Sequence, residues 1–335
     1  MGCGAFHLHC TATREALIGQ PMNDTPIQAR VGGGGVHRQA GRMSVEPIEQ
    51  LNRKQKAGQL GWSPGHFYSP IPDLEEVWRH EAEIFRHPAD IPGVDLRLEQ
   101  QLALLDRLAP HYLGLPFAET KQPGLRYYYD NPNFSYGEAI VLYCMLKLLR
   151  PRRIVEIGSG HSSCVILDTN ELALGNALSC SFIEPYPDLL LGLMKPGDRD
   201  RVRLYRDRVQ DVDPALFGEL EAGDILFIDS SHVSKVGSDV NHIIFEILPR
   251  LRPGVYIHVH DIMAGFEYPK EWVYQGRSWN EAYLVRAFLQ YNTAFTIELF
   301  NSYLGWYHRE AFIARLPLVD RNPGTSLWLR RSEAR

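Results

Sequence analysis

Short apolar runs recur along the second half of the chain, and their spacing limits the folds that it can adopt. Five runs rich in β-branched residues cover residues 154–157, 180–183, 202–205, 225–228 and 255–259. Most are separated by stretches long enough for a crossover helix, which predicts a mostly parallel sheet with helices on both faces. Two later runs, residues 295–300 and 326–329, predict a closing pair of strands. We therefore expect an α/β fold with a doubly wound, mostly parallel sheet of seven strands.

The part of the chain before these runs has a different texture. Residues 1–60 contain the run VGGGG, few aromatic residues and no sustained periodicity, which predicts a flexible tail. Residues 61–150 form a predicted N-terminal helical segment, with helices expected over residues 74–85, 96–108 and 136–149. The last of these helices should end before Pro151. Residues 151–331 then make up the predicted sheet domain.

Charge and hydropathy argue against two classes of partner. The 335 residues carry a formal net charge of −5 and no basic stripe, so we expect no nucleic-acid partner. No run approaches the roughly 20 apolar residues of a membrane span, and no secretory signal is visible, so no membrane association is expected. Five scattered cysteines favour a reducing cytoplasm over a disulfide framework.

A glycine motif follows the first predicted strand. The strand ends in Glu156, and Gly158, Ser159 and Gly160 come directly after it. In a doubly wound sheet, ligands bind beyond the carboxyl ends of the strands, where glycines let the backbone approach them. A dinucleotide fingerprint would need a third glycine at Ser163, which is absent.

Two further residues stand at the ends of the next strands. Glu184 follows the second strand and could accept hydrogen bonds from the ribose hydroxyls of an adenosine-containing cofactor. The alternative is a surface carboxylate at the start of a loop. Gln210 follows the third strand, at the height where an adenine would lie, although a plain turn explains this position nearly as well.

The fourth and fifth strands both end in polar residues. Asp229 ends the fourth strand, and His258, His260 and Asp261 end the fifth, where strand alternation would place the two histidines on one face. Buried charge is costly unless it is paired or coordinated. A divalent cation such as Mg²⁺, bound by Asp229, His260 and Asp261, would remove the repulsion between the carboxylates. A hydrogen-bonded polar rim without a metal is the alternative.

His232 is the candidate proton acceptor of this region. Its unperturbed pKa of about 6.5 would leave the ring mostly neutral at pH 7, as a general base requires. Asp229, three residues earlier, is the second candidate catalytic residue. Lys235 is weaker, because an unperturbed ammonium has no free lone pair at this pH. A structural histidine that caps the next helix is the alternative reading of His232.

With these motifs in place, residues 136–330 resemble the class I S-adenosylmethionine-dependent methyltransferases. The matching features are EIGSGHSS, the acid in FIEPYP, DILFIDSSH, PGVYIHVHDI and the closing strand pair. The resemblance implies a Rossmann-like methyltransferase fold whose last strand is antiparallel to the others. It also implies that Glu156, Gly158 and Gly160 hold the methionine part of the cofactor and that Glu184 holds the ribose.

Within that class, the chain looks most like the metal-dependent O-methyltransferase branch. That branch takes metal ligands from the ends of the fourth and fifth strands, which implies Asp229 and Asp261, and often has a catalytic Lys or His soon after the first ligand, which matches His232. Two positions depart from its patterns. Ile262 stands where the catechol-type enzymes have Asn, and His260 stands where the cephalosporin-type relatives have an acid.

These features together predict methyl transfer from S-adenosylmethionine to a hydroxyl of a small acceptor, such as a sugar-like compound or another natural product. The aromatic segment of residues 266–283 is expected to cover the acceptor, and Phe134 is expected on the opposite wall. A nicotinamide-dependent oxidoreductase and a cofactor-binding relative that does not methylate are the alternatives. Whether the protein forms a homo-oligomer stays open.

Overall fold

The computed structural model describes residues 50, 53, 58 and 61–332, and it divides the chain after Asp73 into two compact units. In the first unit, the described residues form turns in which the ring of Trp62 stacks on that of His66, with centroids 4.3 Å apart. Apart from three isolated positions, the predicted tail of residues 1–60 lies outside the described residues. The second unit, Leu74–Arg335, contains the sheet.

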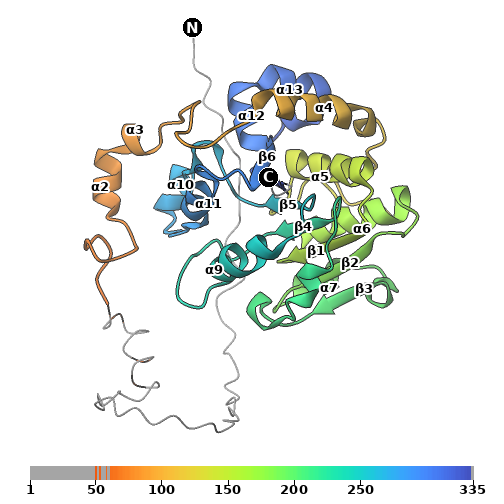
Figure 1. Cartoon of the computed structure of the whole chain (residues 1–335), viewed down its shortest axis with the longest axis horizontal. Coiled ribbons are helices and arrows are strands. Elements are labelled where there is room, and N and C mark those ends of the chain that lie inside the picture. Colours follow the sequence, from red (N-terminus) through yellow and green to blue (C-terminus); the bar gives the residue numbers. More distant parts are fainter. Residues whose placement is uncertain (1–49, 51–52, 54–57, 59–60, 333–335) are drawn as a thin grey trace. The chain divides into compact units, whose positions relative to one another are not determined.

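Seven strands form one sheet in the order β3-β2-β1-β4-β5-β7-β6 (Figure 1). Their bounds are Arg153–Ile157 (β1), Ser179–Ile183 (β2), Val202–Tyr205 (β3), Ile225–Ile228 (β4), Tyr256–Val259 (β5), Phe295–Phe300 (β6) and Leu327–Arg331 (β7). The first five strands pair in parallel, whereas β7 is antiparallel to both β5 and β6. The predicted fold class is confirmed, and each strand lies within two residues of its expected position.

The sheet reverses its order of strands at β1, and this reversal determines where a ligand can bind. From β1 the chain moves outward to β2 and β3 in one direction, and β4 and β5 extend the sheet in the other. Because such crossovers are right-handed, their helices cover opposite faces. The carboxyl ends of β1 and β4 lie side by side at the reversal, with Ile157 opposite Ile228. This is the place where doubly wound sheets open a crevice for ligands.

Helices form the N-terminal segment and connect the strands of the sheet. Their bounds are Leu74–Arg79 (α2), Glu81–Ile84 (α3), Leu98–Tyr112 (α4), Tyr136–Leu149 (α5), His161–Ala173 (α6), Asp188–Leu193 (α7), Ala215–Gly218 (α8), Asp239–His242 (α9), Lys270–Tyr274 (α10), Glu281–Leu289 (α11), Asn301–Tyr307 (α12) and Arg309–Arg315 (α13). A π-helical turn, Ile243–Ile247 (η3), continues α9, and the 3₁₀ turn Val209–Asp211 (η2) follows β3.

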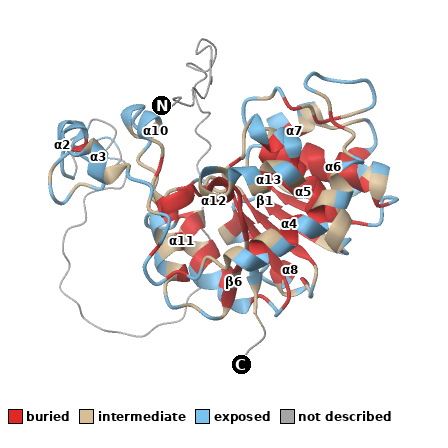
Figure 2. Cartoon of the chain, turned by 90° about the horizontal axis from the view of Figure 1, so that it is seen from above, coloured by how far each residue is buried: buried red, intermediate tan, exposed pale blue. Residues whose placement is uncertain are grey.

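Helix α5 is deeply buried, as is α6. Residues 137–146 are all buried, and Figure 2 shows buried residues continuing from α5 and α6 into the strands. The helix begins where predicted because Ser135 and Glu138 form a capping box, and it ends at Arg150, which takes a left-handed conformation before Pro151. Its first turn therefore delivers the Glu138 carboxylate into the protein interior.

The expected helix over residues 74–85 is wrong in one respect, because it breaks into α2 and α3. At His80 the backbone leaves the helical region, with φ −116° and ψ 19°, and the imidazole Nδ1 lies 2.9 Å from the Glu76 oxygen. The Glu76 carbonyl also accepts from the His80 nitrogen at 3.2 Å, so the imidazole shares the helical bond at the point where the helix breaks. No helix in the described part of the chain is both long and apolar enough to cross a membrane.

Candidate active site

The carboxylate of Glu156 lies beneath the glycine loop. It is fully buried, and it accepts hydrogen bonds from Ser162 Oγ, at 2.7 Å, and from Ser163 Oγ. Burial raises the pKa of Glu156 to about 8, although the serine hydroxyls oppose this shift. These contacts tie β1 to the first turn of α6, so Glu156 supports the loop from below. A direct contact between Glu156 and a cofactor stays a prediction.

Gly158 is required by the close approach of two strand ends. Its φ is +77°, and a Cβ atom there would lie 1.9 Å from the main-chain oxygen of Asp229. The main-chain nitrogen of Asp229 in turn donates to Ile157 O at 2.8 Å. Only glycine combines this conformation with this contact. The loop after β1 and the loop after β4 are therefore packed against each other.

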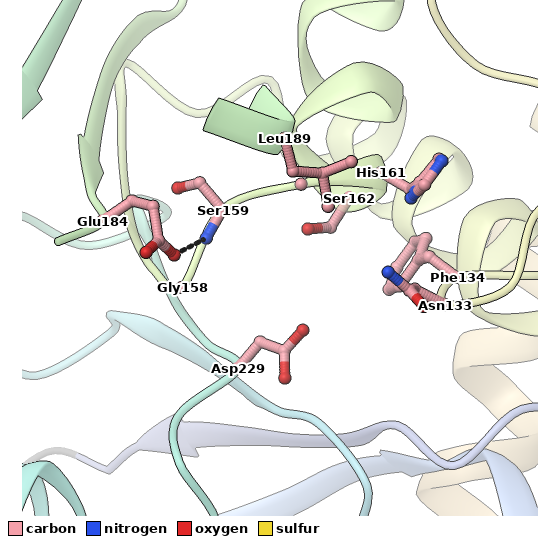
Figure 3. Close-up of a pocket in the computed structure, with 10 residues that line it drawn as sticks. Asn133, Phe134, Gly158, Ser159, His161, Ser162, Glu184, Leu189 and Asp229 are labelled. Carbon is pink, nitrogen blue, oxygen red and sulfur yellow. Dashed lines mark hydrogen bonds between the residues drawn. The ribbon is translucent and has the colours of Figure 1, made fainter. Parts of the chain in front are cut away.

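The loop and Glu184 border an open pocket of about 430 Å³ (Figure 3). Glu184 accepts from the main-chain nitrogens of Ser159, at 3.1 Å, and Tyr186, at 2.8 Å. Of the residues predicted for the site, the pocket brings together Gly158, Ser159, Gly160, Glu184, Asp229 and Phe134; Asn133, His161, Ser162 and Leu189 also line it. An acid, exposed main-chain groups and two apolar side chains are suited to an adenosine-bearing ligand.

The pocket wall that carries Phe134 is fixed by side chains of its own segment. Asn131 Nδ2 donates to Phe134 O at 2.8 Å, and its Oδ1 accepts from the Phe134 nitrogen at the same distance. Tyr127 OH also donates to Phe134 O. Further back, the buried guanidinium of Arg126 pairs with Asp168 and Asp198. The segment before α5 is thereby held on α6.

Gln210 does not line this pocket. It lies in η2, where its amide nitrogen donates to Gly237 O at 2.8 Å across the loop that follows β4. Its predicted contact with an adenine stays a prediction, and the structure gives the side chain a role in holding two loops together.

His232 lies among three carboxylates. Its Nε2 atom is 3.4 Å from Asp229 Oδ1 and 3.7 Å from Asp261 Oδ2, while Nδ1 is 2.8 Å from Glu281 Oε2. Burial opposes the charged ring, but the contacts with Asp229 and Glu281 outweigh it and raise the pKa of His232 to about 10. The ordinary pKa that the sequence suggested therefore does not apply to this residue. Conversely, His260 and His232 hold the pKa of Asp229 below its usual value, against the effect of burial.

A second cluster adjoins Asp261. Donor atoms of Glu138, His260 and Asp261 all lie within 4.8 Å of one another. Thr325 Oγ1 lies 3.0 Å from Glu138 Oε1 and 2.9 Å from Asp261 Oδ1, so a hydroxyl with one hydrogen stands between two carboxylates. Burial raises the pKa of Glu138, although nearby His260 opposes this. Two carboxylates and an imidazole are a chemically suitable donor set for a divalent metal ion.

No sequence pattern identified three residues of the site, which are Glu138, Glu281 and Thr325. Glu138 fits the capping-box pattern S-x-x-E, which ordinarily marks an exposed helix start, and Glu281 follows Asn280 at the start of another helix. Their burial is the informative property, since Glu138 is 7% and Glu281 1% exposed. An acid at the start of an otherwise apolar helix was the available signal for Glu138.

The two histidines of β5 have different surroundings. His258 and His260 lie on one face as predicted, with ring centroids 5.7 Å apart. His258 stacks on Phe227 at 3.8 Å, and its Nε2 is 2.9 Å from Ser326 Oγ. His258 thus belongs to the packing of the sheet, whereas His260 reaches the acidic cluster.

The aromatic segment of residues 266–283 contacts His232. The ring of Trp279 lies 4.4 Å from the imidazole, and Trp272 packs edge-on against Trp279 at 5.3 Å. The guanidinium of Arg277 lies over both indoles, at 4.5 and 5.0 Å. The segment therefore provides an aromatic wall beside the proposed base.

Comparisons with known proteins bear on the family. Residues 155–262 match a protein family described as "Methyltransferase domain". An uncharacterised protein of Archaeoglobus fulgidus is 38% identical over 168 residues, which is 47% of this chain and 73% of the relative.

Several solved structures are similar at lower identity. The SAH-bound methyltransferase PaMTH1 of Podospora anserina is 16% identical, with 82% of this chain and 100% of that chain covered and a TM-score of 0.41. CmcI-N160 without ligand is 18% identical, with 83% and 100% covered and a TM-score of 0.39. The O-methyltransferase TomG of Streptomyces achromogenes, involved in tomaymycin synthesis and solved with SAM, is 14% identical, with 78% and 97% covered and a TM-score of 0.38.

The family match spans β1 to the residue after Asp261, and so it includes the glycine loop, Glu184, Asp229 and His232. It decides in favour of a methyltransferase and against the nicotinamide-dependent oxidoreductase that the glycine motif had left open. Residues 155–262 of this chain therefore belong to the methyltransferase domain family.

Proposed function

We propose that this methyltransferase transfers its methyl group to a hydroxyl oxygen of a small acceptor, sugar-like or another natural product, and that His232 accepts the proton. The observation that carries the proposal is the position of Asp229. Its side chain lines the pocket proposed for the cofactor and also lies 3.4 Å from His232 Nε2. A methyl donor in that pocket and an acceptor beside His232 would therefore be neighbours.

In this proposal, each group has one task. S-adenosylmethionine supplies an electrophilic methyl group, and its sulfur leaves as a neutral thioether when the acceptor oxygen forms the new C–O bond. Because the pKa of His232 is raised to about 10, only the deprotonated form of the ring can take the hydroxyl proton at Nε2, and turnover should therefore rise with pH. Trp279 packs against the same ring. Asp229 holds the ring from the pocket side. The aromatic wall of Trp272 and Trp279 suits the apolar face of a sugar or an aromatic ring.

The metal site belongs to the same proposal. Glu138, His260 and Asp261 are the residues that would hold a divalent cation. Asp229, the third ligand that the sequence predicts, is not part of this cluster, and it faces Asp261 across His232 Nε2. Such a cation would offset the charge of these carboxylates and polarise an acceptor oxygen. The donor set fits because its carboxylates share one hydroxyl hydrogen from Thr325.

The test is transfer of tritium from methyl-labelled S-adenosylmethionine to catechol, as an aromatic diol, and to methyl glucoside, as a sugar polyol. We expect labelled methyl ether from one of them with Mg²⁺ or Mn²⁺ present. Replacement H232A should lower turnover by about 10²-fold or more, since a positioned base contributes 10²–10⁴. H242A, at the end of α9, is the matched control. Undiminished turnover in H232A would refute the base role.

A further inference from the structure

Glu281 is a buried acid that nothing in the methyl-transfer chemistry requires. It is 1% exposed, and both carboxylate oxygens are engaged. Oε2 lies 2.8 Å from His232 Nδ1, and Oε1 accepts from Ser230 Oγ at 3.0 Å. An ionised carboxylate only accepts hydrogen bonds, so Nδ1 of His232 must carry the hydrogen of this contact. The other ring nitrogen, Nε2, is thereby the one directed towards Asp229 and Asp261.

The main chain of His232 is held by the same helix end. His232 O accepts from the nitrogens of Asn280, at 3.0 Å, and Glu281, at 3.1 Å, which are the first donors of α11. Asn280 also accepts from the Ser234 nitrogen through Oδ1, at 2.6 Å. His232 itself has φ +60°, a conformation that costs a non-glycine residue energy and persists only where the surroundings enforce it. The start of α11 therefore fixes both the backbone and the ring.

This arrangement joins two distant parts of the sequence. His232 follows β4, whereas Glu281 lies within the aromatic segment that follows β5, at the start of α11. An acid that orients a histidine through Nδ1 leaves proton exchange to Nε2, which is the division of labour in acid–histidine pairs of hydrolytic enzymes. Here Nε2 faces Asp229 at 3.4 Å, so it can accept a proton only after it has released the one that it shares with that carboxylate. The orienting acid lies two residues after Trp279, which packs against the same ring.

The geometry points to Glu281 as the positioning residue of His232, which aims Nε2 at the acceptor oxygen. This inference rests on the proposed function, because it gives Glu281 no role in methyl transfer except through His232. It makes the aromatic segment part of the catalytic apparatus, since displacement of α11 would release the base.

The contact is tested first on the whole protein, without an acceptor. In protein labelled with ¹⁵N-histidine, the His232 signals are those lost in H232A. We expect a slowly exchanging Nδ1–H proton in the wild type. It should persist in E281Q, whose amide oxygen still accepts, and disappear in E281A. An unchanged Nδ1–H signal in E281A, or its absence in the wild type, would overturn the inference.

A double-mutant cycle with the diol that is methylated then tests the role. E281A should lower kcat roughly tenfold to a hundredfold, with KM and the affinity for S-adenosylmethionine changed by less than about twofold. On the H232A background, E281A should cost nothing more. An equal loss in both backgrounds would show a merely structural role and refute the inference. Full activity of H232A would instead refute the base role, while the NMR result on the contact would stand.

Discussion

A Cβ atom on Gly158 would lie 1.9 Å from the main-chain oxygen of Asp229. These two residues follow the paired strands β1 and β4, so the glycine loop and the loop that carries Asp229 and His232 are packed against each other. We expect G158A to lower the free energy of unfolding by more than about 2 kcal/mol, because alanine would be strained in the left-handed conformation and would also clash with Asp229 O. The same variant should abolish binding of S-adenosylmethionine. Thermal melting and calorimetry measure the two effects.

The control for that variant is G160A. Gly160 has an extended φ of −174°, and a Cβ atom there would meet only Leu189 Cδ2, at 3.3 Å. G160A should keep a near-normal melting temperature. If both variants melt alike, the close approach of Asp229 is not what requires glycine at position 158.

Glu184 should contribute to the binding of the adenosine part of the cofactor. Hydrogen bonds to a charged group contribute about 1.5–3 kcal/mol, so E184A should raise the Kd for S-adenosylmethionine by about tenfold to a hundredfold. Methylthioadenosine, which lacks the amino-acid part, should lose affinity by a similar factor. Titration calorimetry compares both ligands, with D188A as an exposed acidic control. Equal affinities in E184A and D188A would remove the ribose role.

The buried acid Glu156 should make the stability depend on pH. Its pKa is about 8 in the folded protein and near 4.5 when unfolded, so between these values only the folded state holds the proton. The contribution of Glu156 to the free energy of unfolding should therefore be greatest below pH 4.5. Between pH 4.5 and pH 8 it should fall by at most about 1.4 kcal/mol per pH unit. The difference between wild type and E156Q, followed by urea unfolding from pH 5 to 8, isolates this effect. A difference that does not vary with pH would contradict it.

The ion pairs of Arg126 should be essential for folding. R126M would leave the buried carboxylates of Asp168 and Asp198 without their cation, which typically costs about 3–5 kcal/mol. The exposed pair of Arg208 and Asp211 is the control, and R208M should leave the urea midpoint unchanged. If R126M changed the urea midpoint as little as R208M, the prediction would be wrong, and water would have to replace the guanidinium beside Asp168 and Asp198.

A cation should stabilise the folded protein if the acidic cluster binds one. At a concentration of Mn²⁺ about 100 times its Kd, binding would add about 2.7 kcal/mol to the free energy of unfolding. The increase should shrink in E138Q and in H260A and persist in H242A, as measured by melting with and without EDTA. No increase in the wild type would favour the alternative of a hydrogen-bonded rim without metal.

The sequence allowed the sheet to be placed because its strands are short, apolar and β-branched, and because helix α5 carries its own start and stop signals. The predicted and observed bounds of β3, β4, β6 and α5 agree. Strand-end logic also placed Glu184 and Asp229 on the pocket, since both lie at carboxyl ends of a parallel sheet.

What the sequence did not predict depends on three-dimensional proximity. Glu281 and His232 are 49 positions apart, and no local pattern pairs them. The raised pKa of His232 follows from that pairing and from Asp229, so an isolated histidine could not reveal it. Gln210 was placed correctly after β3, yet its amide nitrogen donates to Gly237 O in a neighbouring loop, a contact that no local pattern predicts.

The antiparallel strand β7 lies between β5 and β6, and Thr325 at its entrance lies between two carboxylates of the acidic cluster. The sheet thus has a gap at an interior position until residues 327–331 have been synthesised. A nascent chain that already contains the glycine loop, His232 and Glu281 would still expose the edges of β5 and β6. On the ribosome, catalytic competence should therefore arise late and in one step, when the final strand is inserted.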